Sequence, residues 1–345
     1  MELETKELDR KTPAARKPKL NRLGKSRVAV TELSFGGVGI GNFYGRVSNV
    51  AARAVIETAW QHGIRYFDTA PQYGLGLSER RLGTVLRDHP RDTYTVSTQV
   101  GCRLEPTVEG GNDLTNGFAV PATHRRVWDF SAYGVRRSLE ESLRRLGLTR
   151  VDIVYFHAPV LHVEQAFREG YPELERMRGE GLVRAIGTRI NQFDLSTSLL
   201  RDTDMDVIQC VGRYNLLDQR ALVQLLPAAQ ELGISVVIGG PFCSGLLADP
   251  KPGSRYAQAP SGLSRSALAL KAAAARHGTS VSAAALAFCS AHPAVASVLI
   301  GARSYEQIID VVHQFSAKVP ADFWQYLKRS HLILDSAPVP QETTS

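Results

Sequence analysis

The stretch SAYGVRRSLEESLRRLGLTRVDIVYFH, residues 131–157, contains one complete helix–strand unit of the predicted fold. Its first part, residues 131–147, has the pattern of an amphipathic helix. After a short turn, residues 151–157 form an apolar run with valine and isoleucine, which is typical of a strand buried on both faces. Strands of this kind, joined to helices by short turns, indicate a parallel sheet that is covered by helices.

The same alternation runs through most of the chain. The predicted strands are 32–40, 64–70, 93–100, 151–157, 183–190, 206–212, 234–240 and 295–302. The predicted helices are 48–63, 77–88, 131–147, 163–180, about 192–202, 218–232, 264–277, 280–291, 304–315 and a last one near 320–332. Eight strand–helix pairs predict an α/β fold, a (β/α)8 TIM barrel with a long polar loop after strand three (101–130) and a C-terminal helix. A doubly wound open sheet is the alternative.

Composition and the chain ends set the expected organisation. The chain has 345 residues, of which 43% are hydrophobic and 22% charged, as is ordinary for a globular protein. We predict a disordered tail over 1–21, a single barrel domain over 22–332 and a flexible tail over 333–345. No run approaches the roughly 18 apolar residues that span a bilayer, and the N-terminus lacks the apolar segment of a secretory signal. A cytoplasmic protein without a membrane partner is therefore expected.

Cysteine spacing and charge exclude several classes of protein. The four cysteines lie far apart, which argues against a disulfide framework and a structural zinc site, so no metal is expected. Most of the net charge of +7 comes from residues 1–27, which hold nine Lys and Arg against four Asp and Glu. There is no basic stripe interleaved with aromatic residues, so no nucleic-acid partner is predicted.

Polar residues stand at the C-terminal ends of most predicted strands. They are Asp68, Gln99, His157, Asn191 and Gln209, with the segments GGPFCSG (239–245) and GARS (301–304) after the last two strands. In a (β/α)8 barrel these ends form one mouth, where active sites lie. The sequence therefore predicts a ligand site there, with residues 101–130 placed to fold over it as a lid.

Three motifs then resemble those of the aldo-keto reductases: RYFDTAPQYGLGLSERRLG (65–83), VDIVYFHAP (151–159) and GARSYEQI (301–308). The segments at 134–154 and 239–247 are similar to the fucose/threo-aldose dehydrogenase and pyridoxal dehydrogenase branch. The resemblance covers about residues 22–316. It implies hydride transfer between a nicotinamide cofactor, NADP or NAD, and a small carbonyl or alcohol substrate, by a monomer or homo-oligomer.

The resemblance also implies a catalytic tetrad of Asp, Tyr, Lys and His. Asp68, Tyr73 and His157 match three of its members, but Gln99 stands where relatives carry the lysine. An ammonium beside a tyrosine lowers the phenol pKa by roughly 1–3 units, so its loss is expected to weaken proton transfer. Burial without a cation should also raise the pKa of Asp68. Gln99 is open to three interpretations: a structural filler, an inactivated variant or a change of chemistry.

Further site residues follow from the resemblance. The implied cofactor-binding residues are Asn42, Asn191, Gln209, Phe242, Ser244, Gly245, Leu246, Gly301, Arg303 and Gln307. The implied substrate-binding residues are Phe43, Tyr44 and Trp128, in loops expected over the mouth, and Arg189, an arginine where this branch carries a small residue.

Two function classes remain open at this point. The first is an aldo-keto reductase-type oxidoreductase, with a weakened redox step, that acts on a sugar-like carbonyl compound. The second is a refitted non-redox lyase, dehydratase, isomerase or cyclase of bacterial secondary metabolism that uses Asp68, Tyr73 and His157 as acid/base groups. A non-catalytic binding barrel is a third, weaker reading, since barrels host many chemistries.

Overall fold

The computed structural model describes residues 16–159, 161–190, 200–248 and 261–341. Within these ranges eight parallel strands close into a barrel, in the order in which they follow one another along the chain. They are β3 (Leu33–Gly36), β4 (Tyr66–Asp68), β5 (Thr95–Val100), β8 (Ile153–His157), β9 (Ala185–Ile190), β10 (Val207–Val211), β11 (Ser235–Gly239) and β12 (Val295–Gly301). This closure confirms the predicted (β/α)8 barrel, because a doubly wound sheet would leave two edge strands unpaired.

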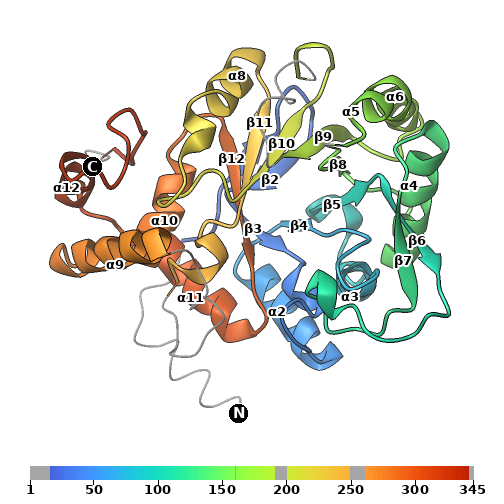
Figure 1. Ribbon diagram of the computed structural model, residues 1–345, viewed down its shortest axis with the longest axis horizontal. Coiled ribbons are helices and arrows are strands. Elements are labelled where there is room, and N and C mark those ends of the chain that lie inside the picture. The colour runs from blue at the N-terminus through green and yellow to red at the C-terminus, as the bar shows by residue number, and fades with distance from the viewer. Residues whose placement is uncertain (1–15, 160, 191–199, 249–260, 342–345) are drawn as a thin grey trace.

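Helices cover the outside of the barrel (Figure 1). The described helices are α2 (Asn49–Gln61), α3 (Leu77–Leu86), α4 (Ala132–Leu146), α5 (Val163–Gln165), α6 (Tyr171–Gly179), α8 (Leu225–Leu232), α9 (Ser261–Arg276), α10 (Val281–Ser290), α11 (Tyr305–Ser316) and α12 (Ala321–Arg329). Around the ring α11 packs on α2, α2 on α3, α3 on α4 and α4 on α6. Ser48, Ser131 and Ser280 start α2, α4 and α10, each accepting a backbone N–H hydrogen bond three residues on.

The segment 101–130 is more ordered than the long loop that the sequence predicts. It contains two antiparallel strands, β6 (Cys102–Pro106) and β7 (His124–Trp128), which lie beside α4 in Figure 1. The sequence of β7, HRRVW, hides the strand pattern because its charged residues read as a solvated loop. In the structure Arg125 pairs with Glu105 at 2.9 Å.

Two predicted helices are interrupted. Between α5 and α6 a π-helical turn covers Ala166–Gly170. The helix predicted over 218–232 begins only with α8, after a separate 3-10 turn. Pro227 explains this break, because a proline deep inside a helix would clash with the carbonyl of Val223, four residues earlier. The helix predicted at about 192–202 lies mostly outside the described residues.

Ordered structure reaches beyond the predicted domain bounds at both ends. β1 (Leu20–Arg22) pairs with β2 (Ala29–Thr31) as an antiparallel hairpin. The connecting turn buries Leu23 and Val28 in the interior of the barrel at the N-terminal end of its strands. At the other end of the chain, Ile333 and Ala337 are buried. Part of each segment predicted as a tail, at Leu20–Asn21 and at Ile333–Ala337, therefore has described structure.

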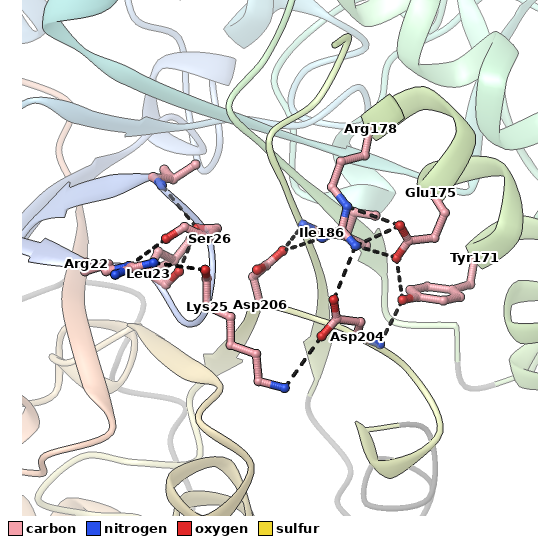
Figure 2. Close-up of polar contacts among 11 residues, drawn as sticks. Arg22, Leu23, Lys25, Ser26, Tyr171, Glu175, Arg178, Ile186, Asp204 and Asp206 are labelled. Carbon is pink, nitrogen blue, oxygen red and sulfur yellow. Dashed lines mark hydrogen bonds and ion pairs between the residues drawn. The ribbon is translucent and has the colours of Figure 1, made fainter. Parts of the chain in front are cut away.

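Ion pairs close the end of the barrel that faces this hairpin. Figure 2 shows Asp206, just before β10, accepting hydrogen bonds from the backbone of Ile186 at 3.0 Å and from Arg178 at 3.1 Å. The turn of the hairpin joins them, since Lys25 lies 3.5 Å from Asp204. This network holds β9 and β10 at their N-terminal ends. It does not involve the C-terminal ends of these strands.

Two further observations bear on the class of protein. No helix in the described ranges combines the length and the apolar character that crossing a membrane requires. All four cysteines are free thiols, and three of them are buried.

The contact between α3 and α4 gives a first prediction. A Cβ atom at Gly83 would overlap the carbonyl oxygen of Leu146. Although alanine favours helix formation, we expect Gly83→Ala to destabilise the fold by roughly 2–3 kcal/mol, through overpacking. The matched control is Gly179→Ala in α6, where a Cβ would meet nothing within 4 Å. This control should be neutral or slightly stabilising. Urea unfolding measures both, and equal stability of the two variants would contradict the packing argument.

Candidate active site

Five polar residues converge at the C-terminal end of the barrel. They are Asp68 on β4, Gln99 on β5, His157 on β8, Arg189 on β9 and Gln209 on β10. Side chains alternate along a strand, and Tyr66, Tyr155 and Val207 belong to the interior cluster. The residues two positions further on, Asp68, His157 and Gln209, therefore face the interior as well. Strand register places Arg189 directly between His157 and Gln209.

Gln99 joins the predicted acid/base residues into one hydrogen-bonded group. Its side chain is fully buried, and its Nε2 atom donates to the Tyr73 hydroxyl at 3.3 Å. Its Oε1 atom is hydrogen-bonded to Nδ1 of His157 and accepts from Nε2 of Gln72 at 3.1 Å. The amide therefore bridges Tyr73 and His157 without bringing a charge.

Gln72 is a member of this group that the sequence analysis misses. Its Nε2 atom also lies 2.5 Å from Nδ1 of His157, and its Oε1 atom is buried without a hydrogen-bond partner among the described residues. The only sequence signal is its position next to Tyr73, and a neutral amide in a turn has many purely structural uses.

His157 is held as a neutral imidazole. Burial lowers its pKa to about 3, and the positive charges of Arg189 and Arg126 act in the same direction. The indole of Trp128 stacks on the ring, with centroids 5.3 Å apart. At physiological pH the imidazole can therefore donate one hydrogen bond and accept another, but it carries no charge.

Asp68 is a buried carboxyl group that forms no ion pair within the described part of the chain. It is 1% exposed and accepts a hydrogen bond from the Ser97 hydroxyl at 2.6 Å. Burial raises its pKa to about 7, while Ser97, Gln209 and Arg189 oppose the rise. The Gln209 amide approaches the carboxyl, yet its Nε2 atom makes no hydrogen bond of good geometry among the described residues. The raised pKa confirms the effect of burial that the sequence predicts.

A chain of hydroxyls continues from Asp68 into the barrel. The Tyr66 hydroxyl is hydrogen-bonded to Ser97 at 3.0 Å and to the Tyr155 hydroxyl at 2.9 Å. Neither Ser97 nor the two tyrosines carried a signal in the sequence, because each sits within an apolar strand. Their role is to satisfy the polar atoms beneath the carboxyl.

Tyr73 stands in the turn after β4 and is half-buried. Burial raises the pKa of its phenol above the ordinary value of 10.0, and the neighbouring carboxyl of Asp68 adds to this. The charge of Arg189 and the hydrogen bond from Gln99 act in the opposite direction. The neutral phenol is therefore the resting form, as suits a proton donor.

The hairpin segment brings aromatic rings to the same place. Phe118 lies beside Tyr73, with ring centroids 6.3 Å apart, and packs on Phe43 at 5.0 Å. Trp128 belongs to β7 rather than to a loop, which corrects the sequence prediction, but it reaches His157 as described above. Tyr44 contacts Phe43 and is 44% exposed. These rings border the acid/base group on the side of the hairpin.

The predicted cofactor residues are distributed over several turns. Asn42 is committed to its own turn, because its Oδ1 atom accepts hydrogen bonds from the backbone of Val47 and from Arg81, both at 2.9 Å. This use leaves little of the Asn42 side chain for a ligand. Asn191 lies outside the described residues.

The turn after β11 carries four of these residues: Phe242, Ser244, Gly245 and Leu246. Its backbone is unusual, because Cys243 and Ser244 have positive φ values of 47° and 54°, followed by Gly245 at 94°. Backbone held in the left-handed region by non-glycine residues is costly and concentrates at ligand-binding turns.

Gly301, Arg303 and Gln307 follow at the end of β12 and in the first turn of α11. The backbone N–H of Arg303 donates to the Gln307 side chain at 2.7 Å. The Nε atom of Arg303 is buried and has no hydrogen-bond partner among the described residues. No group of three or more His, Cys, Asp or Glu side chains in the described ranges is placed to hold a metal ion.

Known proteins are similar to this chain over most of its length. Residues 32–331 match the model of the aldo/keto reductase family. The chain is 40% identical to a D-threo-aldose 1-dehydrogenase of a Pseudomonas species, over 89% of this chain and 95% of that protein. It is 35% identical to a pyridoxal 4-dehydrogenase of Microbacterium luteolum, over 90% and 97%. The holo structure of the aldo-keto reductase AKR11C1 from Bacillus halodurans superposes with a TM-score of 0.75 at 27% identity, over 94% of this chain and 99% of that one.

The buried carboxyl of Asp68 predicts a pH-dependent stability. The folded protein keeps this proton up to about pH 7, whereas an unfolded chain releases it near its ordinary value of 3.8. Stability should therefore fall as pH rises between these two values. An asparagine side chain cannot ionise, so we expect Asp68→Asn to be roughly 2–4 kcal/mol more stable than the parent at pH 8, relative to their difference at pH 4. Urea unfolding at both pH values measures this gap, and a gap that does not change with pH would contradict the burial of a titrating carboxyl.

Proposed function

The chain belongs to the aldo/keto reductase family and is an oxidoreductase of that family, and we propose that it transfers hydride between a nicotinamide cofactor and a small sugar-like carbonyl compound or its alcohol. The observation that carries the proposal is the hydrogen-bonded group of Tyr73, Gln99 and His157 beside Asp68 at the C-terminal end of the barrel. Related proteins named for aldoses and for pyridoxal support a polyhydroxylated or cyclic substrate.

The described residues fit a nicotinamide dinucleotide. Gln209 and Arg303 present buried nitrogen atoms without hydrogen-bond partners among the described residues, one at the end of β10 and one after β12. Gln209 would hold the carboxamide, the turn 242–246 the phosphates, and Arg303 with Gln307 the adenosine end. When bound, the cofactor supplies or accepts the hydride. Both NADP and NAD are compatible with these donors.

The chain's own residues would handle the proton and the substrate oxygen. In the reducing direction the carbonyl carbon gains the hydride, and Tyr73 gives its phenolic proton to the carbonyl oxygen. With its single proton on Nε2, the tautomer in which Nδ1 accepts from Nε2 of Gln72, the neutral His157 orients that oxygen with a hydrogen bond, and Trp128 holds the imidazole plane. Oxidation reverses each transfer, with Tyr73 taking the hydroxyl proton as the hydride leaves.

Gln99 makes this relay weaker than a charged one. We propose that it occupies the position at which the family carries a lysine. Its Nε2 donates to Tyr73 and thereby favours the phenolate, but a neutral amide does so less than an ammonium group. The burial of both side chains strengthens this difference, because a charge acts further in a medium of low dielectric constant.

A second candidate function rests on Asp68. A buried carboxyl with a pKa of about 7 is suited to general acid/base work near neutral pH. Together with Tyr73 and His157 it would support a lyase, dehydratase, isomerase or cyclase that needs no nucleotide. Turnover in the absence of any nucleotide would favour this function over hydride transfer.

Nucleotide binding tests the main proposal. Titration of the protein with NADPH and NADH, followed by nucleotide fluorescence and by quenching of its three tryptophans, should give micromolar dissociation constants for at least one of them. Arg303→Gln should weaken that binding about tenfold, because it removes a buried unpaired donor. Absence of binding of both nucleotides at several hundred micromolar would defeat the proposal.

The neutral relay gives a second test. Gln99→Lys should raise kcat/KM for an aldose by about 10- to 100-fold with the preferred nucleotide, because one pKa unit on Tyr73 corresponds to about a tenfold change. The matched control is Gln99→Met, which keeps the length of the side chain but brings neither a charge nor an N–H donor. It should not raise the rate. An equal rise in both variants would show that charge is not what the relay lacks.

A further inference from the structure

Arg189 places a positive charge inside the ring of strand ends. It lies on β9, paired in register with His157 on one side and with Gln209 on the other. Gly187 and Ala185, two and four positions before Arg189, lie on the same face of β9 as Arg189. Ala185 belongs to the interior cluster. The guanidinium therefore starts from the interior face of the barrel, at the level of the imidazole.

No described carboxylate neutralises this charge. The described part of the chain offers Arg189 no carboxylate oxygen within 4.0 Å, and its Nε atom is buried without a hydrogen-bond partner there. Arg126, the other cation near His157, shows the usual arrangement. It forms two hydrogen bonds with Asp113, at 2.7 and 2.6 Å, and a third with the backbone of Gln72 at 3.0 Å. A half-buried guanidinium without such a partner raises the free energy of the folded protein. Anionic groups nearby or a bound ligand must offset this increase.

The groups that face this charge belong to the proton relay. The charge of Arg189 acts on Asp68 of β4, on Tyr73 in the turn that follows it, and on His157, its register partner on the neighbouring strand β8. The hydroxyls of Tyr66 and Tyr155 lie beneath them, hydrogen-bonded to Ser97 and to each other. Arg126 is the only further charged group that acts on His157 among the described residues, and it is already paired.

We propose that Arg189 supplies, from β9, the positive charge that Gln99 does not supply from β5, and so acts as a positioning residue for the proton relay. This inference rests on the proposed function, in which Tyr73 exchanges a proton with the substrate. An arginine keeps its proton at any pH the protein tolerates, so it adds charge without competing as an acid.

The electrostatic effects of Arg189 agree with this role. Its charge lowers the pKa of Asp68, of Tyr73 and of His157, and so favours the deprotonated form of all three groups. These are the effects that a relay cation should have on a carboxylate, a phenolate and a neutral imidazole. Since burial still raises the pKa of Asp68 to about 7, the compensation is partial.

The direct test measures Asp68 in the full chain without nucleotide. The carboxyl carbon of Asp68, labelled with carbon-13 and assigned with Asp68→Asn, is titrated by NMR between pH 4 and pH 10. Arg189→Gln should raise the midpoint by about one pH unit or more, and Arg189→Lys should leave it near the parent value. Arg168→Gln is the matched control, since it removes one charge from an exposed side chain between α5 and α6 and should not move the midpoint. An unchanged midpoint in Arg189→Gln overturns the proposal.

Kinetics separate this inference from the proposed function. Arg189→Gln should lower kcat about tenfold and leave KM for the aldose unchanged, and Gln99→Lys in the same chain should restore kcat. Arg189→Met serves as the second variant if Arg189→Gln does not fold. An increase in KM alone, confined to carboxylate-bearing substrates, would make Arg189 a substrate-anion receptor and overturn the proposal. If the parent chain bound no nucleotide, the proposed function would be defeated. The NMR midpoints would still show whether the charge of Arg189 acts on Asp68.

Discussion

Closure of eight parallel strands into a barrel forces every second side chain of each strand into one narrow interior. At the N-terminal end this space is filled by Leu23 and Val28 from the hairpin turn, so it is apolar and sealed. In the middle it holds the hydroxyls of Tyr66 and Tyr155, which bond to each other. The carboxyl of Asp68 and the imidazole of His157 follow at the C-terminal end. The interior therefore becomes more polar from the N-terminal to the C-terminal end of the strands, and the site lies at the polar end. The pKa of each ionisable group there depends on how deeply the group is buried.

Depth explains why the groups at this end depart from their behaviour in water. The same burial that makes the imidazole of His157 neutral keeps a proton on Asp68 up to about pH 7. A lysine at position 99 would counter the second effect, and Gln99 does not. The guanidinium of Arg189, which pairs with no carboxylate of the described ranges, counters it in part from across the ring of strands. In this account the acid/base groups of the relay keep their positions, while the positive charge stands on β9 instead of β5. The proton transfer is then slower than with a lysine at position 99.

How far the sequence predicted this structure depends on the kind of signal. The barrel was predictable because its strands are apolar runs of regular length between helices. The hairpin of β6 and β7 was not, because the consecutive residues Arg125 and Arg126, which are paired in the structure, look like solvated loop residues. Asp68, Tyr73 and His157 stand out through their motifs, whereas Gln72 and Ser97 carry no such signal. Asn42 shows the reverse case, since its side chain is used by its own turn.

The central claim is that Tyr73 exchanges a proton with the substrate while a hydride moves to or from the substrate carbon. A single-turnover experiment tests it most directly: the protein in excess over NADP⁺ or NAD⁺ is mixed with a panel of aldoses and pyridoxal, and the absorbance of the reduced nucleotide is followed. The account predicts reduction of the nucleotide by at least one substrate, at a rate that Tyr73→Phe lowers by at least about 100-fold without changing nucleotide affinity. Equal rates in the parent and in Tyr73→Phe, with nucleotide bound to both, would contradict the account.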